Sequence, residues 1–326
     1  MSKKQKVKIF AGSSSIKLAT KISEKLGIPL SDRKIIHFAD GETFVKANST
    51  VRGCKVFVIQ STSNPVNESI MELLVFIDSL KRASAKEIVA VIPYYGYARQ
   101  DRKAHPREPI TAKLVANLLT AAGASRIVTM DLHARQIQGF FDIPVDHMEA
   151  LPIFAKYFLT QGFTSKDTVV VSPDIGGVKR ARGLASWLHA PLAIIDKRRP
   201  KANVSEVMHL IGDVEGKNAI LIDDIIDTAG TICNAADALR KFGAKEVYAC
   251  ATHPVFSGPA VERLKNSSFT NIIVTDCIEL KPEQIFEKLK IVSTSSMFSE
   301  TIKRIFSNEA ISNLFALPEE IEEHEK

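Results

Sequence analysis

The sequence contains few cysteines and no long apolar segment. Its four cysteines, Cys54, Cys233, Cys250 and Cys277, show no CxxC spacing, which argues against a zinc site or a disulfide framework and predicts a reducing compartment. No stretch approaches the roughly 18 to 20 consecutive apolar residues that cross a bilayer, and no apolar signal-peptide core follows the lysine-rich N-terminus. We therefore expect a cytoplasmic protein with no membrane partner.

Two common phosphate-binding signatures are also missing. The absence of GxxxxGK[ST] excludes a P-loop, and the absence of GxGxxG excludes the usual dinucleotide fingerprint. The run GSSS at residues 12–15 follows the first apolar segment, but by itself it is only a weak phosphate-loop signal. A phosphate site must therefore be sought in another loop.

The composition that remains is ordinary for a globular protein. Of 326 residues, 45% are apolar and 25% are charged, which argues against a disordered chain. At roughly 150 residues per domain, this length predicts about two domains. The net charge of +6 favours an anionic partner such as a phosphate ester, a nucleic acid or a membrane surface. A nucleic acid is disfavoured, because no aromatic and basic residues interleave in a stacking motif.

Short apolar runs alternate with amphipathic segments along the chain. Most runs are apolar without alternation, which is typical of parallel strands covered on both faces. Between them lie helical patterns, one of which Asn67 can cap. We predict an α/β fold with mostly parallel sheets flanked by helices. The predicted strands are residues 8–10, 55–60, 87–92, 126–130, 168–172, 192–195, 219–222, 246–251 and 271–274.

An internal match suggests two similar domains. Residues 111–133 and 231–253 align without a gap, and each is predicted to form a helix, a Gly-Ala turn and a buried strand, with a closing histidine. We interpret the match as a duplication. The predicted domains are residues 1–149 and 150–299, with residues 300–317 packing back on the first domain and an acidic tail at 318–326.

The most informative segment is AILIDDIIDTAGT at residues 219–231. A buried strand leads into the adjacent carboxylates Asp223 and Asp224, and a loop of small residues then precedes a helix. Such a loop and helix N-terminus can bind a phosphate, while the two carboxylates can accept hydrogen bonds from a diol or hold a divalent cation. A sugar phosphate satisfies both halves. The alternative, an acidic turn that only caps a helix, is disfavoured because two acids at a buried strand end are costly.

This segment resembles the phosphoribosyl-pyrophosphate-binding loop of type I phosphoribosyltransferases. Nearly the whole chain is similar to the ribose-phosphate pyrophosphokinase family, through FADGE (38–42), MELL (71–74), PYYGYARQDRK (93–103), DLHARQIQGFFDIPVDH (131–147), VSPDIGGVKRA (171–181), IIDKRRP (194–200) and THPVFSGPA (252–260). The resemblance implies two tandem type I phosphoribosyltransferase-like domains. It also implies transfer of the β,γ-diphosphoryl group of Mg-ATP to the C1 hydroxyl of ribose 5-phosphate, with release of AMP.

The resemblance assigns substrate and metal roles to residues that the chemistry alone leaves open. The basic segment 97–109 could be a solvated loop or a flap over phosphates, Phe38 could be a loop anchor or stack on adenine, and His133 could be a capping residue or a ligand. By resemblance, ATP is bound by Phe38, Asp40, Gly41, Glu42, Arg99, Gln100, Asp101 and His133. Mg²⁺ is held by His133 and Asp174, and ribose 5-phosphate by Arg199, Asp223, Asp224, Asp227, Thr228, Ala229, Gly230 and Thr231.

A second basic cluster follows the predicted strand 192–195. Concentrated positive charge at a strand end suits phosphoryl transfer, which relies on positioning and charge neutralisation, although a solvated turn would look similar. We predict that Lys197 and Arg199 are the catalytic pair because they are separated by one residue and can point to the same face. The sequence alone does not select them over Arg198.

Two other functions compete with the synthetase. A phosphoribosyltransferase that consumes the diphosphate sugar would share the acidic loop, and a non-catalytic regulatory homologue would be expected to have lost the basic or acidic residues, all of which are present. The resemblance further implies a hexamer regulated by phosphate and ADP. Pro106, Arg135, His147 and Ala310 depart from the usual family pattern, so we predict that regulation differs here rather than catalysis.

Overall fold

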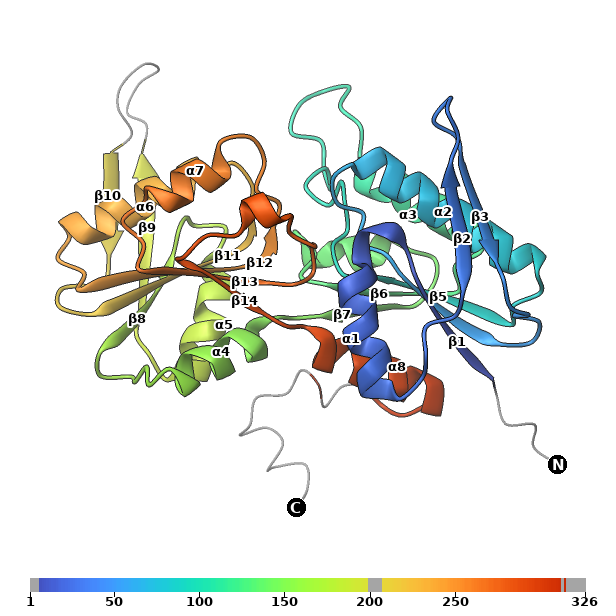
Figure 1. Cartoon of the computed structure of the whole chain (residues 1–326). Helices are drawn as coiled ribbons and strands as arrows, with labels where there is room; N and C mark the ends of the chain where they lie inside the picture. The colour runs from blue at the N-terminus through green and yellow to red at the C-terminus, as the bar shows by residue number, and fades with distance from the viewer. Residues whose placement is uncertain (1–5, 199–206, 312–313, 315–326) are drawn as a thin grey trace. The chain divides into compact units, whose positions relative to one another are not determined.

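The computed structural model describes residues 6–198, 207–311 and 314, and the chain divides into two compact units. The first unit comprises residues 1–149, 277–279 and 293–326, as far as they are described, and the second comprises 150–276 and 280–292. Each unit contains its own mostly parallel sheet (Figure 1). Among the described residues, no helix has the length and apolarity required to span a membrane.

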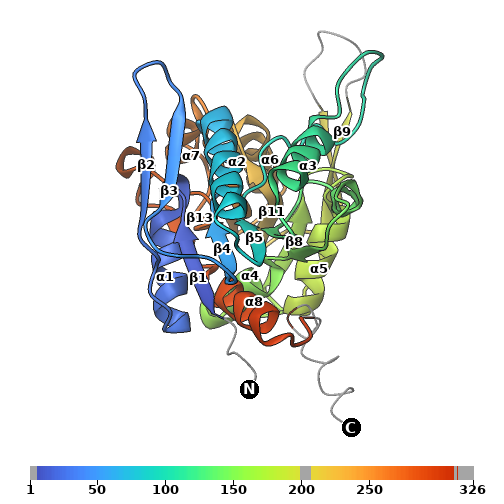
Figure 2. The same cartoon turned by 90° about the vertical axis from the view of Figure 1, so that its right-hand side faces the viewer.

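The first unit is built on a five-stranded parallel sheet in the order β1-β4-β5-β6-β7. Its strands are β1 (Val7–Ala11), β4 (Lys55–Ile59), β5 (Glu87–Ile92), β6 (Arg126–Met130) and β7 (Val145–Met148). An antiparallel hairpin of β2 (Arg33–His37) and β3 (Thr43–Ala47) projects beyond the sheet (Figures 1 and 2). The helices are η1 (Ser13–Ser15), α1 (Ile16–Leu26), α2 (Val66–Arg82), α3 (Thr111–Ala122), η2 (Arg135–Phe140) and α8 (Ser295–Ser307).

Both faces of this sheet are covered, which explains the continuous apolar runs. Val56 and Val58 of β4 belong to a core formed with α2 and α3. The intervening Phe57 and the following Ile59 are equally buried and face the other side, where α1 and α8 lie (Figure 2). The Nζ atom of the buried Lys55 donates to the Ile305 carbonyl at 3.1 Å, which fastens α8 to the sheet.

The second unit contains a seven-stranded sheet in the order β10-β9-β8-β11-β12-β13-β14, antiparallel only between β9 and β10. Helices α6 and α7 pack on one face, and α4 and α5 lie on the other (Figure 1). Its elements are α4 (Leu151–Thr160), β8 (Thr168–Ser172), α5 (Val178–Leu188), β9 (Leu192–Arg198), β10 (Val207–Ile211), β11 (Asn218–Ile226), α6 (Gly230–Lys241), β12 (Glu246–Pro254), α7 (Ala260–Lys265), β13 (Asn271–Thr275), η3 (Pro282–Gln284) and β14 (Leu289–Val292).

The sheet topologies correct the register of the predicted repeat. In the first unit the chain runs from β1 through α1 to Leu30, which bridges Ile9 on the edge of β1 opposite β4. In the second unit it runs from β8 through α5 to β9, on the edge of β8 opposite β11. The strand order therefore matches α2–β5 with α6–β12, rather than α3–β6 with α6–β12 as predicted.

The sequence supports this corrected register. Residues 80–88 read LKRASAKEI and residues 239–247 read LRKFGAKEV, spanning a helix end, a turn and a strand start in each unit. Ser84 and Gly243 occupy the same place in these segments, and both have a left-handed backbone, with φ of 63° and 88°. The shared strand order and turn support a duplication, one helix–strand step away from the predicted alignment.

One predicted helix start is also corrected. Helix α2 begins at Val66, and no side chain caps it, so Asn67 does not act as the N-cap. Instead, Asn67 Oδ1 accepts a 2.6 Å hydrogen bond from the Tyr97 hydroxyl. The residue therefore ties the helix to the turn after β5.

Candidate functional site

Two adjacent carboxylates lie near the carboxyl end of β11. The strand extends to Ile226, so Asp223 and Asp224 lie within it rather than directly after it, as the predicted strand 219–222 implied. The Asp224 N–H donates to Asp223 Oδ1 at 2.8 Å. The Asp224 side chain is only 7% exposed, whereas that of Asp223 is 32% exposed. Asp223 is therefore the more accessible acceptor of the pair.

Arg180, on helix α5, lies beside both carboxylates. Its Nη1 atom is 3.3 Å from Asp224 Oδ1 and 3.5 Å from Asp223 Oδ1. Burial raises the pKa of the Asp223 carboxyl, Asp224 raises it further, and the Arg180 guanidinium opposes both effects. Sequence reasoning gave Arg180 no role, although VKRA was among the quoted motifs, because only the packing of α5 on the sheet brings it to the acids.

The loop after β11 leads directly into α6. Ala229 adopts a left-handed backbone with φ of 61°, and the helix begins at Gly230. Arg263 donates from Nη1 to the Thr228 carbonyl at 3.0 Å, and the Ser257 N–H donates to the Asp227 carbonyl at 3.0 Å. The carbonyls are thus held by neighbours, while the exposed Thr228 and Thr231 and the first N–H groups of α6 remain as donors suited to an anion.

The loop between β8 and α5 presents another carboxylate. Asp174 is exposed, and its Oδ1 accepts the Gly177 N–H at 2.8 Å, while the Ser172 hydroxyl donates to its carbonyl at 2.6 Å. A Cβ atom at position 177 would lie 2.9 Å from Ser172 Oγ, so a larger residue there would displace this hydroxyl. The predicted metal ligand is therefore a carboxylate fixed by the turn that begins α5.

One member of the predicted catalytic pair, Lys197, lies near the end of β9. Lys197 is part of β9, where its backbone pairs with Met208 of β10. Arg199 lies outside the described residues. The structure thus gives the backbone context of one member of the pair, and the roles of both remain predictions.

In the first unit, the predicted adenine loop forms the tip of the β2–β3 hairpin. The Phe38 N–H donates to the Glu42 carbonyl at 2.8 Å, and the Glu42 N–H donates to Asp40 Oδ1 at 3.1 Å. Gly41 has φ of 93°, which favours glycine. The Phe38 side chain is 48% exposed, and its ring centroid lies 6.4 Å from that of Phe44. A flat aromatic surface is therefore presented at an exposed tip.

The turn between β5 and α3 contains the other predicted nucleotide residues. Arg99 and Gln100 are exposed, and Gln100 Oε1 accepts from the Thr111 hydroxyl at 2.5 Å. Asp101 Oδ2 accepts from Gln136 Nε2 at 3.2 Å, so η2 supports this turn. His133 is exposed in the loop between β6 and η2.

Glu108 organises the rest of this basic flap. Its carboxylate accepts the N–H groups of Ala104 and His105 at 2.8 and 2.9 Å, and it also contacts His105 Nδ1 at 2.8 Å. The backbone and side-chain bonds from His105 lower the pKa of the Glu108 carboxyl. The flap is therefore a closed turn around one acid, with its basic residues outside.

Gly96 joins this turn to the loop after β4, and its replacement provides a stability test. A Cβ atom at position 96 would lie 2.4 Å from the Thr62 carbonyl oxygen, which is backbone and cannot rotate away. We expect Gly96→Ala to cost about 1–3 kcal/mol and to lower Tm by about 3–8 °C in a thermal melt. Gly139→Ala is the matched control, since nothing lies within 4 Å of its added Cβ atom. Equal melting of the two variants would refute the close approach.

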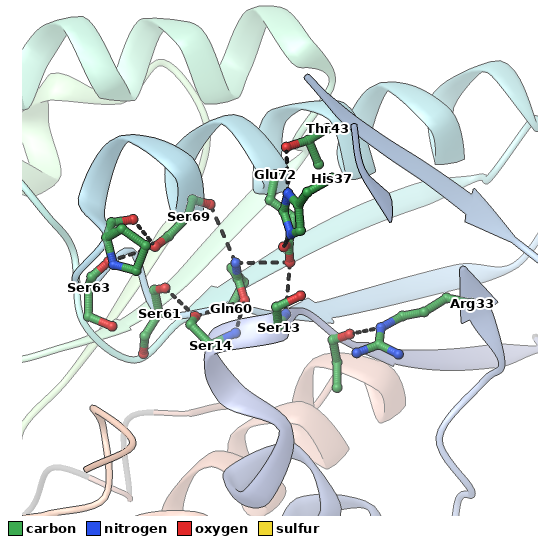
Figure 3. Close-up of polar contacts among 12 residues, drawn as sticks. Ser13, Ser14, Arg33, His37, Thr43, Gln60, Ser61, Ser63, Ser69 and Glu72 are labelled. Carbon is green, nitrogen blue, oxygen red and sulfur yellow. Dashed lines mark hydrogen bonds and ion pairs between the residues drawn. The ribbon is translucent and has the colours of Figure 1, made fainter. Parts of the chain in front are cut away.

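The first-unit loops after β1 and β4 bond to each other and to buried side chains (Figure 3). Gln60 Oε1 accepts the Ser14 N–H at 3.0 Å and its hydroxyl at 2.8 Å. The Ser61 N–H donates to Ser15 Oγ at 2.8 Å. Glu72 Oε1 accepts the Ser13 N–H at 2.7 Å. Oxygen atoms of the protein thus occupy the amides that a phosphate would need, which explains why the 12–15 run does not make a phosphate loop.

Comparison with known proteins matches both parts of the chain. A family model for the N-terminal domain of ribose phosphate pyrophosphokinase matches residues 7–123, and one for the phosphoribosyl synthetase-associated domain matches residues 198–316. The ribose-phosphate pyrophosphokinase of Fusobacterium nucleatum subsp. nucleatum is 62% identical over 309 residues, covering 95% of this chain and 98% of the relative. The chain belongs to the ribose-phosphate pyrophosphokinase family.

Other members of the family are similar to this chain over nearly its whole length. The relative from Caldanaerobacter subterraneus subsp. tengcongensis is 60% identical over 309 residues, covering 95% of this chain and 98% of its own. The crystal structure of phosphoribosylpyrophosphate synthetase from Mycobacterium smegmatis superimposes with a TM-score of 0.88 at 44% identity, covering 93% of this chain and 100% of that chain. The predicted fold class, and the prediction of an enzyme of the ribose-phosphate pyrophosphokinase family, are confirmed.

Proposed function

We propose that the chain transfers the β,γ-diphosphoryl group of ATP to the C1 hydroxyl of ribose 5-phosphate, forming 5-phosphoribose 1-diphosphate and AMP. The observation that carries the proposal is the pairing of two carboxylates on β11 with the donor-rich start of α6. A diol and a phosphate on one small molecule match these two features. Membership of the family supports the same reaction.

The sugar phosphate binds at the second unit in this proposal. Its phosphate accepts hydrogen bonds from the loop N–H groups and hydroxyls of residues 227–231. Its ring hydroxyls donate to Asp223 and Asp224, whose charge is balanced by Arg180 at 3.3 to 3.5 Å. Because the corresponding loops of the first unit use their donors internally, one sugar-phosphate site per chain is expected.

The nucleotide binds through residues of the first unit. Phe38 stacks on adenine, with Asp40 and Glu42 as acceptors for its amino group, and Arg99 and Gln100 contact the nucleotide near the start of α3. The exposed tip of the β2–β3 hairpin supports this role, because its aromatic ring is available to a ligand. We propose that the tip reaches the ATP of a neighbouring subunit, so that assembly is needed for activity.

Charge neutralisation supplies the chemistry. The C1 hydroxyl attacks the β-phosphorus in line, AMP leaves, and Lys197 and Arg199 stabilise the charge that spreads over the transferring group. No covalent intermediate with the protein is required. Mg²⁺, when bound, would neutralise further charge on the diphosphoryl group.

The donors fit a magnesium ion that is bound mainly by the substrate. Among the described residues, no group of three or more His, Cys, Asp and Glu side chains could hold a metal ion by itself. Mg²⁺ in nucleotide sites usually keeps several waters and takes one or two protein ligands beside the phosphates. Asp174, exposed and fixed by the Gly177 N–H, and His133 would be those ligands.

Release of AMP tests the proposed reaction. Protein incubated with Mg²⁺, ATP and ribose 5-phosphate should form AMP and 5-phosphoribose 1-diphosphate in equal amounts, and omission of the sugar should abolish both. A phosphoribosyltransferase would form no AMP from this mixture, and a non-catalytic homologue would leave ATP unchanged. Either result would refute the proposal.

Regulation and assembly remain proposals of the same kind. Arg135 is paired with Glu149 at 2.5 Å, and His147 Nε2 accepts the Leu132 N–H at 2.9 Å, so both unusual residues are engaged within the first unit. We propose a hexamer whose response to phosphate and ADP differs from the family pattern. Repeating the AMP assay across phosphate and ADP concentrations tests that response.

A further inference from the structure

Glu72 is a buried acid to which the proposed reaction assigns no role. It lies on α2, and its side chain is only 3% exposed. A buried carboxylate is costly unless its oxygens have partners, so the contacts of each oxygen indicate what the residue holds in place.

The two carboxylate oxygens of Glu72 contact different parts of the first unit. Oε1 accepts the Ser13 N–H at 2.7 Å and the Gln60 Nε2–H at 3.1 Å, which closes the loops after β1 and β4. Oε2 lies 3.8 Å from Nε2 of His37, the last residue of β2 (Figure 3). When the His37 ring is protonated, the carboxylate therefore forms an ion pair between the body of the unit and the hairpin.

His37 occupies the final rung of the hairpin before the 38–42 loop. It is in register with Thr43, and its Nδ1 lies 3.2 Å from Thr43 Oγ1. One ring nitrogen therefore contacts β3, while the other faces α2. The next residue is Phe38, so the orientation of this ring fixes the rung from which the exposed loop extends.

Another polar contact between the hairpin and the sheet lies at the far end of the same strand. Arg33, the first residue of β2, donates from Nε to the Ala11 carbonyl (Figure 3). Val45 in the middle of β3 is buried in the core with α2. The hairpin is thus held at its base and middle by these contacts, and next to its tip by His37 and Glu72.

We propose that Glu72, acting through His37, is a positioning residue for the 38–42 loop and sets its affinity for the adenine nucleotide. This inference rests on the proposed role of that loop in ATP binding. Loss of the contact leaves the loop intact but less ordered, so nucleotide binding must then order it. Sugar binding, at the second unit, does not depend on it.

Three variants separate positioning from a general structural effect. Glu72→Gln keeps the size of the side chain and an acceptor for Ser13, but removes the charge that faces His37. His37→Ala removes the other partner at a site where the side chain is 53% exposed, so folding should be little affected. Ser69→Ala, on the same helix as Glu72, is the matched control, because its buried hydroxyl donates to the Ser63 carbonyl before the helix and does not touch the hairpin.

Kinetics should show a selective change. We expect Glu72→Gln and His37→Ala each to raise KM for ATP about 3- to 10-fold, with kcat and KM for ribose 5-phosphate within about twofold of the parent values. The double variant should show no larger rise in KM for ATP than the more strongly affected single variant, since both substitutions remove the same contact. Additive effects, or an equal rise of KM in Ser69→Ala, would overturn the proposal.

Two measurements that need no turnover keep this test independent of the proposed reaction. Hydrogen exchange at residues 38–43 should become faster in Glu72→Gln and His37→Ala and stay unchanged in Ser69→Ala. Calorimetric Kd values for a non-hydrolysable ATP analogue should rise about 3- to 10-fold in the first two variants only. Failure of the parent protein to release AMP would refute the proposed reaction alone. Unchanged exchange and Kd, or no binding of the analogue by the parent, would overturn the positioning role.

Discussion

Replacing Lys197 by alanine is expected to lower turnover by about a hundredfold to a thousandfold while ribose 5-phosphate still binds. In a reaction without a covalent intermediate, the protein contributes mainly by placing fixed charges where negative charge spreads in the transition state. Lys197 lies on β9, whose backbone pairs with β10 at this position. In the proposed mechanism, the phosphate of the sugar is held separately, at the start of α6.

The measurement is the rate of AMP release, with binding of ribose 5-phosphate followed by calorimetry. Arg198→Ala is the matched control, since it removes one positive charge from the same strand. A drop in kcat for Lys197→Ala with an unchanged sugar Kd identifies transition-state stabilisation. Unchanged turnover would remove Lys197 from the mechanism, and an equal loss in Arg198→Ala would point to net charge rather than position.

Replacing Arg180 by methionine is expected to lower kcat/KM for ribose 5-phosphate about 10- to 100-fold at neutral pH. The guanidinium lies 3.3 and 3.5 Å from the two carboxylates, and the side chain is only 21% exposed. Removing one member of a largely buried ionic group leaves the other charges uncompensated, although the exposed third of Asp223 reduces this penalty. Methionine keeps most of the packing volume, so the loss is chiefly electrostatic.

The pH profile distinguishes this effect from misfolding. Arg180 lowers the pKa of the Asp223 carboxyl, so its loss should raise that pKa and leave more of the carboxyl protonated at neutral pH. A protonated carboxyl is a poorer acceptor for the sugar hydroxyl, and activity of the variant should therefore recover as pH rises. Arg182→Met, on the exposed side of the same helix, is the control. A uniformly reduced profile of unchanged shape would contradict the electrostatic role.

Apolar runs in the sequence predicted the buried central strands well. Strands with a mixture of buried and exposed residues were predicted poorly. Strands β4 and β8 are buried at every position, and each contains an unbroken apolar run, at residues 56–59 and 169–171. The hairpin strand β2 reads RKIIH with no fully buried residue, and β3 has only Val45 buried. Such strands are set by pairing with one another, which a scan for buried runs does not detect.

The acidic loop was recognisable because its residues are consecutive in the sequence. Asp223, Asp224 and the start of α6 follow one another, so local reasoning could place them together. The roles of Arg180 and Glu72 were not predictable in this way, because their partners are far away in the sequence. Asp223 lies 43 positions after Arg180, and His37 lies 35 positions before Glu72. The repeat was found one helix–strand step out of register, since many helix–turn–strand units look alike until strand order separates them.

The first-unit loops whose amides are bonded by Gln60 and Glu72 also bear on how the two halves diverged. Because Glu72 accepts from the Ser13 amide and Gln60 from the Ser14 amide, loss of either side chain alone would free one amide while the other keeps its protein acceptor. Two replacements would therefore be needed before these first-unit amides could bind an anion, which favours keeping the proposed sugar-phosphate site in the second unit alone.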